Sequence, residues 1–157
     1  MFRPMRRKSK EIDLQAAKEL LHRARYGVLA VQGDGGYPYA VPVNYLYEET
    51  RRIVFHGAAA GHKADALRAC SKVCFTVVGS ETVKAEPWAP FVQSTVVFGQ
   101  CRMVEDREET LRLVKKLAMK YYPDEATADM KIASSGAAVR MFVIEIEHLS
   151  GKEIQER

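Results

Sequence analysis

Several signatures that define common protein classes are missing from this sequence of 157 residues. Its three cysteines form no C-x-x-C pair, so a cysteine-based metal site is not indicated and we expect no bound metal. No apolar run approaches the roughly 18 residues of a membrane-spanning helix, and no apolar segment follows the N-terminal charges to make a signal peptide. We therefore expect a cytoplasmic protein without a membrane partner.

The two most familiar phosphate-binding patterns are absent as well. No G-x-G-x-x-G follows a predicted strand, which removes the main support for a doubly wound nucleotide-binding fold. Gly57 and Gly61 are too close together for a P-loop, and His62 stands where that pattern requires lysine. A catalytic thiol is not indicated either, because Cys74 and Cys101 lie in apolar runs and are interpreted as small buried residues.

The charge is modest and unevenly placed. A hydrophobic content of 47% and a formal charge of +4 are typical of one ordinary globular domain, covering residues 1–157. Residues 1–11 form a basic arm that carries Arg3, Arg6, Arg7, Lys8 and Lys10. A solvated tail, an arm packed on a neighbouring subunit and a contact with a polyanion remain open. No basic face with interleaved aromatic residues supports a nucleic-acid partner.

The hydrophobic pattern predicts helices at 12–25 and 62–70 and a third that begins after Asp106 and ends near Pro123, with 124–137 helical or irregular. Asp13 is a suitable N-cap for the first. Six strands are predicted between them, at 26–32, 37–47, 53–56, 72–79, 91–105 and 139–148. The segment 84–90, which contains Trp88, is predicted to be a loop. We expect an α+β fold, a six-stranded antiparallel barrel with flanking helices.

The strand predicted at 37–47 has two unlike faces. Its bulky face is expected to join the core and consists of Tyr37, Tyr39, Val41, Val43, Tyr45 and Tyr47. The other face contains Pro38, Pro42 and Asn44, and each proline removes one ladder donor. Such a strand belongs at a sheet edge or a barrel opening, where a flat ligand can reach the backbone.

The segment 53–63, with the sequence IVFHGAAAGHK, is the candidate anion site. An apolar strand runs into small residues and then into the predicted start of a helix, where backbone N–H groups lack partners and the helix dipole adds roughly half a positive charge. Lys63 and His62 would add side-chain donors. The pattern indicates a phosphate site or, equally well from these residues alone, a structural turn and helix cap.

Four blocks of the sequence resemble one family: GDGGYPYAVPVNYLY, IVFHGAAAGHKADALR, STVVFGQCRMVED and HLSGKE. They are similar to the pyridoxamine 5′-phosphate oxidase-like split-barrel flavoproteins, and most closely to their nitroimidazole-resistance (Nim-type) branch. The resemblance implies a homodimer of Greek-key split barrels with FMN at the subunit interface.

The resemblance also implies roles for individual residues. Four residues of the second strand would line the flavin ring, namely Val41, Pro42, Val43 and Asn44. His56 and Gly57 would sit beside the ring, with His56 as the catalytic residue. Three residues would hold the phosphate, namely Gly61, His62 and Lys63. Ser94 and Lys152 would approach from the partner chain, with Gly151-Lys152-Glu153 following the last strand.

The expected function is that of a flavin-dependent reductase of small electron-poor molecules such as nitroimidazoles, supplied with electrons by an unidentified reductant. The alternative is a flavin- or haem-binding module of the same fold without catalysis. Oxidation of vitamin B6 is not expected, because the Arg-rich substrate segment of the pyridoxamine phosphate oxidases is missing.

Overall fold

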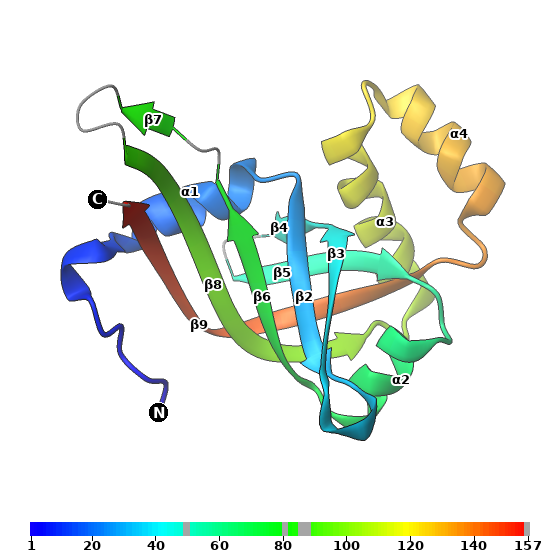
Figure 1. Cartoon of the computed structure of the whole chain (residues 1–157). Helices are drawn as coiled ribbons and strands as arrows, with labels where there is room; N and C mark the ends of the chain where they lie inside the picture. Colours follow the sequence, from blue (N-terminus) through cyan, green and yellow to red (C-terminus); the bar gives the residue numbers. More distant parts are fainter. Residues whose placement is uncertain (49–50, 80–81, 85–88, 156–157) are drawn as a thin grey trace.

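A strongly curled antiparallel sheet forms the centre of the molecule (Figure 1). The computed structural model describes residues 1–48, 51–79, 82–84 and 89–155, and the following elements belong to those ranges. The strands follow the order β3-β2-β6-β8-β9-β5-β4, with β1 beside β9 and β7 beside β8. Their bounds are β1 Glu11–Ile12, β2 Tyr26–Gln32, β3 Pro38–Asn44, β4 Leu46–Glu48, β5 Arg52–Gly57, β6 Lys72–Val78, β7 Thr82–Lys84, β8 Ala89–Met103 and β9 Arg140–Gln155.

Four α-helices lie on the rims of this sheet within the described residues. They are α1 Leu14–Arg23, α2 His62–Ala69, α3 Arg107–Tyr121 and α4 Glu125–Ser135, with short 3-10 turns at Lys8–Lys10 and Asp34–Gly36. The predicted caps of the first and third helices are confirmed, because Asp13 accepts from Ala16 N–H at 2.9 Å and Asp106 from Glu109 N–H at 2.7 Å. In the part of the chain that is described, no helix is long and apolar enough to cross a membrane.

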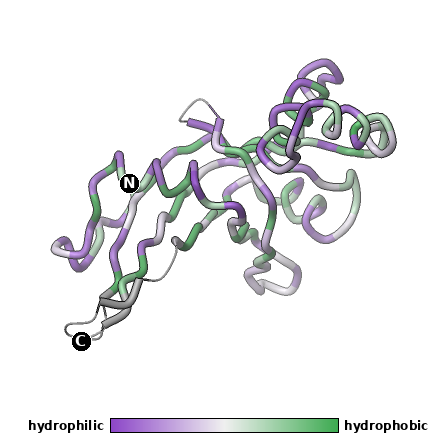
Figure 2. The backbone as a smooth tube through the Cα atoms, turned by 90° about the horizontal axis from the view of Figure 1, so that it is seen from above, coloured by the Kyte–Doolittle hydropathy of each residue, from purple (hydrophilic) through white to green (hydrophobic). Residues whose placement is uncertain are grey.

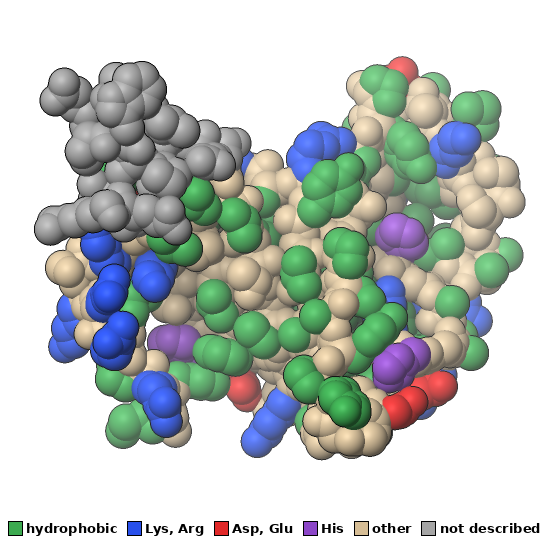
Figure 3. Space-filling view, in the orientation of Figure 1, with side chains coloured by type: hydrophobic (Ala, Val, Ile, Leu, Met, Phe, Trp, Pro, Cys, Tyr) green, Lys and Arg blue, Asp and Glu red, His purple; other side chains and the backbone are tan. Residues whose placement is uncertain are grey.

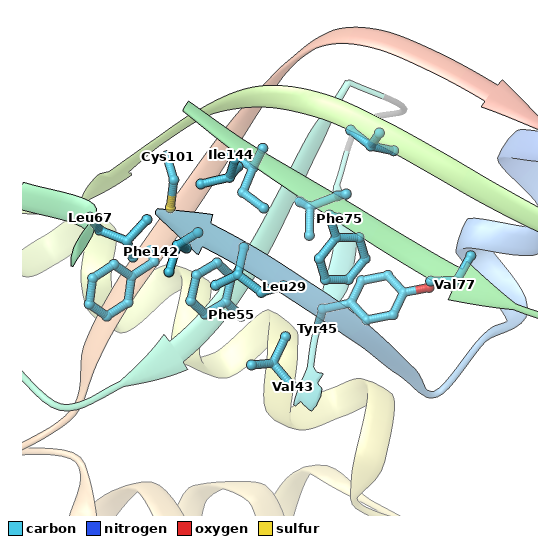
Figure 4. Packing of buried hydrophobic residues seen from close by; sticks show 14 of the residues in the cluster. Leu29, Val43, Tyr45, Phe55, Leu67, Phe75, Val77, Cys101, Phe142 and Ile144 are labelled. Carbon is cyan, nitrogen blue, oxygen red and sulfur yellow. The ribbon is translucent and has the colours of Figure 1, made fainter. Parts of the chain in front are cut away.

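The curl of the sheet comes from its two longest strands, β8 and β9, which pair along most of their length. A register shift between Phe98 and Gly99 bends the pair. A Cβ at position 99 would lie 2.3 Å from the Glu145 carbonyl oxygen, so only glycine permits this approach. Both halves of the sheet then face the same core, where Phe55, Phe75 and their neighbours interdigitate (Figure 4). Hydrophilic and hydrophobic segments alternate along the chain in Figure 2.

The architecture is α+β and consistent with a split barrel, but the expected number of six strands is wrong. The described sheet contains nine strands, because β1 and β7 carried no sequence signal and one predicted strand is divided in two. The predicted loop at 84–90 is also wrong at both ends, since Lys84 closes β7 and Ala89 opens β8. Trp88 lies outside the described residues.

The predicted strand 37–47 is divided at Tyr45. Its side chain is completely buried and donates a hydrogen bond to the Leu21 carbonyl, while its backbone bonds to α3 instead of a strand. Tyr45 N–H donates to Tyr121 Oη at 3.0 Å, and the Tyr45 carbonyl accepts from Lys120 Nζ at 2.9 Å. The chain therefore leaves the β2 side of the sheet as β3 and joins β5 as β4.

The predicted division of faces holds for this segment from Pro38 onward, because burial alternates along β3 and Tyr39 and Val41 pack against the core. Val43 and Tyr47 are buried, as expected for the core face, but Tyr37 is 77% exposed and that expectation is wrong. Tyr37 precedes β3 and follows a turn, so the barrel does not reach it. The prediction of an edge position is confirmed, because β3 ends the strand order and pairs with β2.

The last strand is longer than the predicted 139–148. Residues 149–155 continue β9, because β8 offers them partners as far as Gln155. Gly151-Lys152-Glu153 therefore lies within the strand and not after it, which corrects the sequence expectation. Charged residues and glycine in this stretch are typical of a loop, so only the pairing with β8 identifies it as a strand.

The basic arm packs on its own chain. Ile12 of β1 pairs with Gly151 of β9, and the Phe2 ring stacks on His148 and Phe98 with centroid distances of 4.9 and 5.6 Å. A fully solvated tail is therefore wrong for this arm. The cysteine prediction is confirmed for Cys101, which is buried, whereas Cys74 is only partly buried.

A group of charged side chains, here called the Glu48 cluster, joins the end of β4 to α3. Glu48 is 4% exposed and pairs with Arg52, Arg112 and Lys116, the last two at 3.0 and 2.9 Å. Burial alone would raise the pKa of Glu48, but hydrogen bonds from Lys116, Arg52 and Arg112 outweigh it and lower that pKa to about 2. The Glu48 carboxylate is therefore the buried centre of an ion-pair network.

Candidate functional site

The end of β5 carries expected site residues and has two neighbours that also carry them, the end of β3 and the start of α2. Asn44 and His56 line one cavity of about 240 Å³, although they belong to different strands. Lys63 of α2 reaches back to the end of β5, where a Cβ at Gly57 would lie 3.1 Å from its Nζ. The end of β5 thus has Asn44 of β3 as a neighbour through the cavity and Lys63 of α2 as a neighbour at Gly57.

The start of α2 has the geometry of an anion site. The first backbone bond of this helix runs from Asp65 N–H to the Gly61 carbonyl at 2.9 Å, so the N–H groups before it have no intrahelical partner. In the described structure no side chain caps these groups. Gly61 has φ of +114°, which favours glycine, and nothing lies within 4 Å of the position that a Cβ would take. The cradle is open, uncapped and suited to a phosphate.

Lys63 supplies an unpaired positive charge to the same place. Its Nζ lies 5.4 Å from the centroid of the Phe55 ring, and burial lowers the pKa of this amine. Among the described residues it has neither a carboxylate partner nor a hydrogen-bond acceptor. The absence of a side chain at Gly57 permits the approach of the amine. A bound anion would supply the missing counter-charge.

His62 is oriented away from the cradle. Its ring stacks on Tyr39 at 4.0 Å between centroids, and its Nε2 accepts the Asp34 N–H at 3.4 Å. The imidazole therefore joins the start of α2 to the turn between β2 and β3. The group of His62 that faces the helix start is its backbone N–H, and the predicted side-chain contact with a phosphate stays a prediction.

Arg68 holds the other side of the cradle. Its Nη2 donates to the Ala59 carbonyl, and its Nη1 pairs with Asp65 at 2.8 Å. Ala59 lies in the middle of the small-residue segment between β5 and α2. Arg68 thus fixes the backbone that would surround an anion.

His56 has an exposed ring at the end of β5, beside the cavity that Asn44 also lines. Burial, and then the positive charge of Lys63, lower the pKa of this imidazole. The ring is therefore biased toward its neutral form, which can accept or donate a hydrogen bond. Perturbed histidine and lysine side chains next to a cavity are typical of functional sites.

The remaining expected residues are distributed over more than one place. Val41 and Val43 face the barrel interior, whereas Pro42 is exposed and lines a second, open cavity of about 840 Å³ on the outer face of the sheet. Ser94 and Lys152 lie opposite each other in the β8–β9 ladder. In Figure 1 the C-terminal end of β9 and α2 lie at opposite ends of the sheet, so one chain does not bring these two residues to the cradle.

The helical wall of the site could not be predicted from the sequence. Tyr121 lines the 240 Å³ cavity and bonds to the Tyr45 backbone, but in the sequence it is only one more member of an apolar helix stripe. The feature of the sequence that could have indicated this role is the hydroxyl group of a tyrosine at the end of an apolar stripe. Ile132 and Ser135 of α4 carried no signal at all, because α4 has a weakly amphipathic sequence.

The curled antiparallel sheet, the edge strand and the open helix start define a class: small α+β barrels with a candidate anion site at one end. The chain belongs to the family described as pyridoxamine 5′-phosphate oxidase, whose sequence profile matches residues 13–153. No curated protein sequence matches this chain.

Solved structures with the same fold include three informative neighbours. A candidate 5-nitroimidazole antibiotic resistance protein from Bacteroides thetaiotaomicron has a TM-score of 0.79 and 20% identity, over 92% of this chain and 87% of that one. A FAD-binding protein from Mesorhizobium loti has a TM-score of 0.66 and 23% identity, over 92% and 97%. A FAD-binding protein from Mycobacterium smegmatis has a TM-score of 0.64 and 15% identity, over 94% and 99%. At these identities the neighbours establish the shared fold.

Proposed function

We propose that this protein binds FMN, with the phosphate at the start of α2, and acts as a flavin-dependent reductase of small electron-poor molecules. The observation that carries the proposal is the partly buried Lys63 amine, which has no anionic partner among the described residues and stands beside an uncapped helix start. The two FAD-binding neighbours and the nitroimidazole-resistance neighbour support a flavin and a reductase.

The residues present fit a flavin phosphate. The backbone N–H groups of His62 and Lys63 can donate to phosphate oxygens, and the Lys63 ammonium can neutralise the negative charge. Arg68 and the His62 ring keep the cradle in shape through Ala59 and Asp34. When bound, the flavin itself accepts and donates the electrons.

The chain's own contribution to the reaction is orientation, polarity and access. Asn44 offers an amide at the edge of the cavity. His56, whose pKa is lowered by partial burial and by Lys63, can orient an electron acceptor by a hydrogen bond or deliver a proton from its ring nitrogen.

A second copy of the chain would complete the site. Ser94 and Lys152 lie far from α2 in one chain, so they could approach the cofactor only from a partner. The open 840 Å³ cavity and the exposed apolar side chains of Tyr26, Val28 and Val78 offer a face for such a homodimer, and Figure 3 shows hydrophobic side chains across this side of the molecule. The proposal is therefore a homodimer with cofactor at the interface.

The first test is the visible spectrum of the purified protein before and after addition of FMN, together with its mass in solution. A flavin spectrum and a dimer support the cofactor and the assembly. Bleaching of that spectrum by NADH or NADPH, followed by recovery on addition of a nitroimidazole, supports a reductase. A flavin that never bleaches would indicate a passive binding module, a Soret band would indicate haem, and a colourless protein that ignores FMN would contradict the proposal.

A substitution separates the role of His56 from cofactor binding. We expect His56→Gln to lower the rate of flavin re-oxidation by the acceptor while FMN affinity stays within about twofold, because the ring lines the cavity and not the phosphate cradle. Equal turnover in the variant and the parent protein would remove His56 from the mechanism.

A further inference from the structure

The cavity that contains His56 has a wall the cofactor proposal does not use. Two helices, α3 and α4, face the end of β5 and the start of β9 and border an open-sided space of about 240 Å³ (Figure 1). Most of its surface is apolar. The apolar residues are Val114, Leu117, Ala118, Ile132, Val139 and Met141.

A few polar groups interrupt this apolar surface. Asn44 and His56 contribute an amide and an imidazole from the strands, and Lys131 and Ser135 contribute an amine and a hydroxyl from α4. No carboxylate lines the cavity in the described structure, so nothing there would balance a positively charged guest. Apolar walls with a small number of hydrogen-bonding groups are typical of sites for small organic molecules.

The volume limits what can enter. A dry protein cavity of about 150 Å³ can hold benzene, so about 240 Å³ is enough for one ring with small substituents. Drug-sized ligands occupy sites of roughly 300 to 1,000 Å³, and a nucleotide, a flavin or a haem is larger than this space. The guest that fits is a single flat ring.

Helix α4, which forms one wall of the cavity, is weakly attached to the rest of the protein. Ala128 is the one residue of α4 that is buried among those described, and the helix is tied to α3 by Lys115, which pairs with Glu125 at 3.1 Å and with Asp129. Lys115, Glu125 and Asp129 are exposed or partly exposed, so these ties are weak in water. Small shifts of α4 can therefore admit a ligand without disturbing the barrel core.

We propose that the space between α3 and α4 is a binding site for an uncharged, single-ring molecule that carries a hydrogen-bond acceptor. The apolar helix surfaces hold the ring, while Asn44 and the neutral His56 donate to the acceptor group. If the proposed reductase function holds, on which this last step rests, the site is where the electron acceptor lies, with its polar group toward the strand ends that face the cofactor.

Binding of nitrobenzene and of toluene, which lacks the acceptor, tests the site on the full-length protein. With methyl-labelled protein and NMR, we expect nitrobenzene to shift the methyl signals of Val114, Leu117 and Ile132 in a saturable way, and to bind several-fold more tightly than toluene. Titrations with and without FMN separate the two proposals. A protein that binds nitrobenzene here but never binds FMN would contradict the reductase and leave this site standing.

A variant that fills the cavity with a larger side chain is the decisive test of this site. Ala118 lines the space from α3, and Ala118→Leu should weaken nitrobenzene binding by roughly tenfold or more, because the larger side chain takes the volume of the ring. Ala133→Leu, on the exposed side of α4, is the matched control and should bind within about twofold of the parent protein. If Ala118→Leu does not fold, Ser135→Leu fills the space from its exposed rim. Shifts that do not saturate, or that persist in the filled variant, would overturn the proposal.

Discussion

Two regions of this molecule contain charged side chains that are buried or partly buried. In one region these charges are paired with each other, whereas in the other the lysine has no carboxylate partner among the described residues. In the Glu48 cluster one carboxylate receives three cationic side chains, and its pKa falls to about 2 because the ion pairs outweigh the cost of burial. At the other region, burial lowers the pKa values of Lys63 and His56, and the positive charge of Lys63 lowers that of His56 further.

The difference identifies which charges hold the fold together and which remain available for a ligand. In the Glu48 cluster the charged side chains neutralise one another, so removing one member leaves the charges of the others uncompensated. A cation without a carboxylate partner among the described residues, beside an uncapped helix start, is poorly satisfied until an anion arrives. Lysine thus has a structural role at Lys116 of α3 and, in our proposal, a binding role at Lys63 of α2.

The largest expected effect comes from removing the carboxylate charge of the Glu48 cluster. Glu48→Gln should lower the free energy of unfolding at pH 7 by about 3 kcal/mol, because Arg52, Arg112 and Lys116 lose their buried counter-charge. Chemical denaturation followed by circular dichroism measures it. Glu108→Gln, at an exposed position of α3, is the control and should change stability by less than about 0.5 kcal/mol.

The Glu48→Gln variant also tests how the stability of the protein depends on pH. The pKa of Glu48 is about 2 in the folded protein and about 4.3 in an unfolded chain, so its contribution is complete above about pH 4.3 and is lost as pH falls toward 2. The stability difference between the parent protein and Glu48→Gln should therefore be constant from pH 7 to about 5 and shrink below that. A difference that persists unchanged at pH 2 would show that the carboxylate charge is not responsible.

The second effect tests the open region. Lys63→Met should weaken FMN binding by roughly 10- to 100-fold, because a charge-assisted contact of about 1.5–3 kcal/mol is lost. Stability without cofactor should stay the same or rise, since the variant removes a partly buried charge that has no carboxylate partner. Fluorescence titration and thermal unfolding measure both. Lys72→Met, at an exposed position of β6, is the control, and undiminished FMN affinity in Lys63→Met would remove the phosphate assignment.

The smallest expected effect tests whether the shape of the backbone before α2, and not only its positive charge, contributes to FMN binding. Arg68→Ala should weaken FMN several-fold and leave riboflavin, which has no phosphate, within about twofold, because Arg68 holds the Ala59 carbonyl and its segment in place. The exposed Arg102→Ala on β8 removes a charge of the same kind without touching that segment. Equal losses for FMN and riboflavin would point to a general structural role for Arg68.

The parts of the fold that the sequence predicted are those with local causes. Asp13 and Asp106 cap helices whose apolar stripes are regular, and β2 has the predicted bounds because turn residues and a helix end flank it. The candidate cradle was equally local, since a strand, small residues and a helix start follow one another in 53–63.

The parts that could not be predicted depend on partners far along the chain. The division at Tyr45 requires Lys120 and Tyr121, about 75 residues away, to bond its backbone. The orientation of the His62 ring is fixed by Asp34 and Tyr39 across a turn. No periodicity within one segment contains this information, because it arises when β3 and α2 are brought together.

The edge strand β3 has a consequence for solubility. A free strand edge invites a second strand to add to it, and in this way growing aggregates can form. Pro38 and Pro42 stand opposite Gln32 and Val28 of β2, and a proline on an edge strand takes a position whose N–H would point away from the sheet. The exposed edge therefore lacks donors at alternate points of the ladder. Replacing both prolines with valine would restore those donors and give the edge the character of a fibril template.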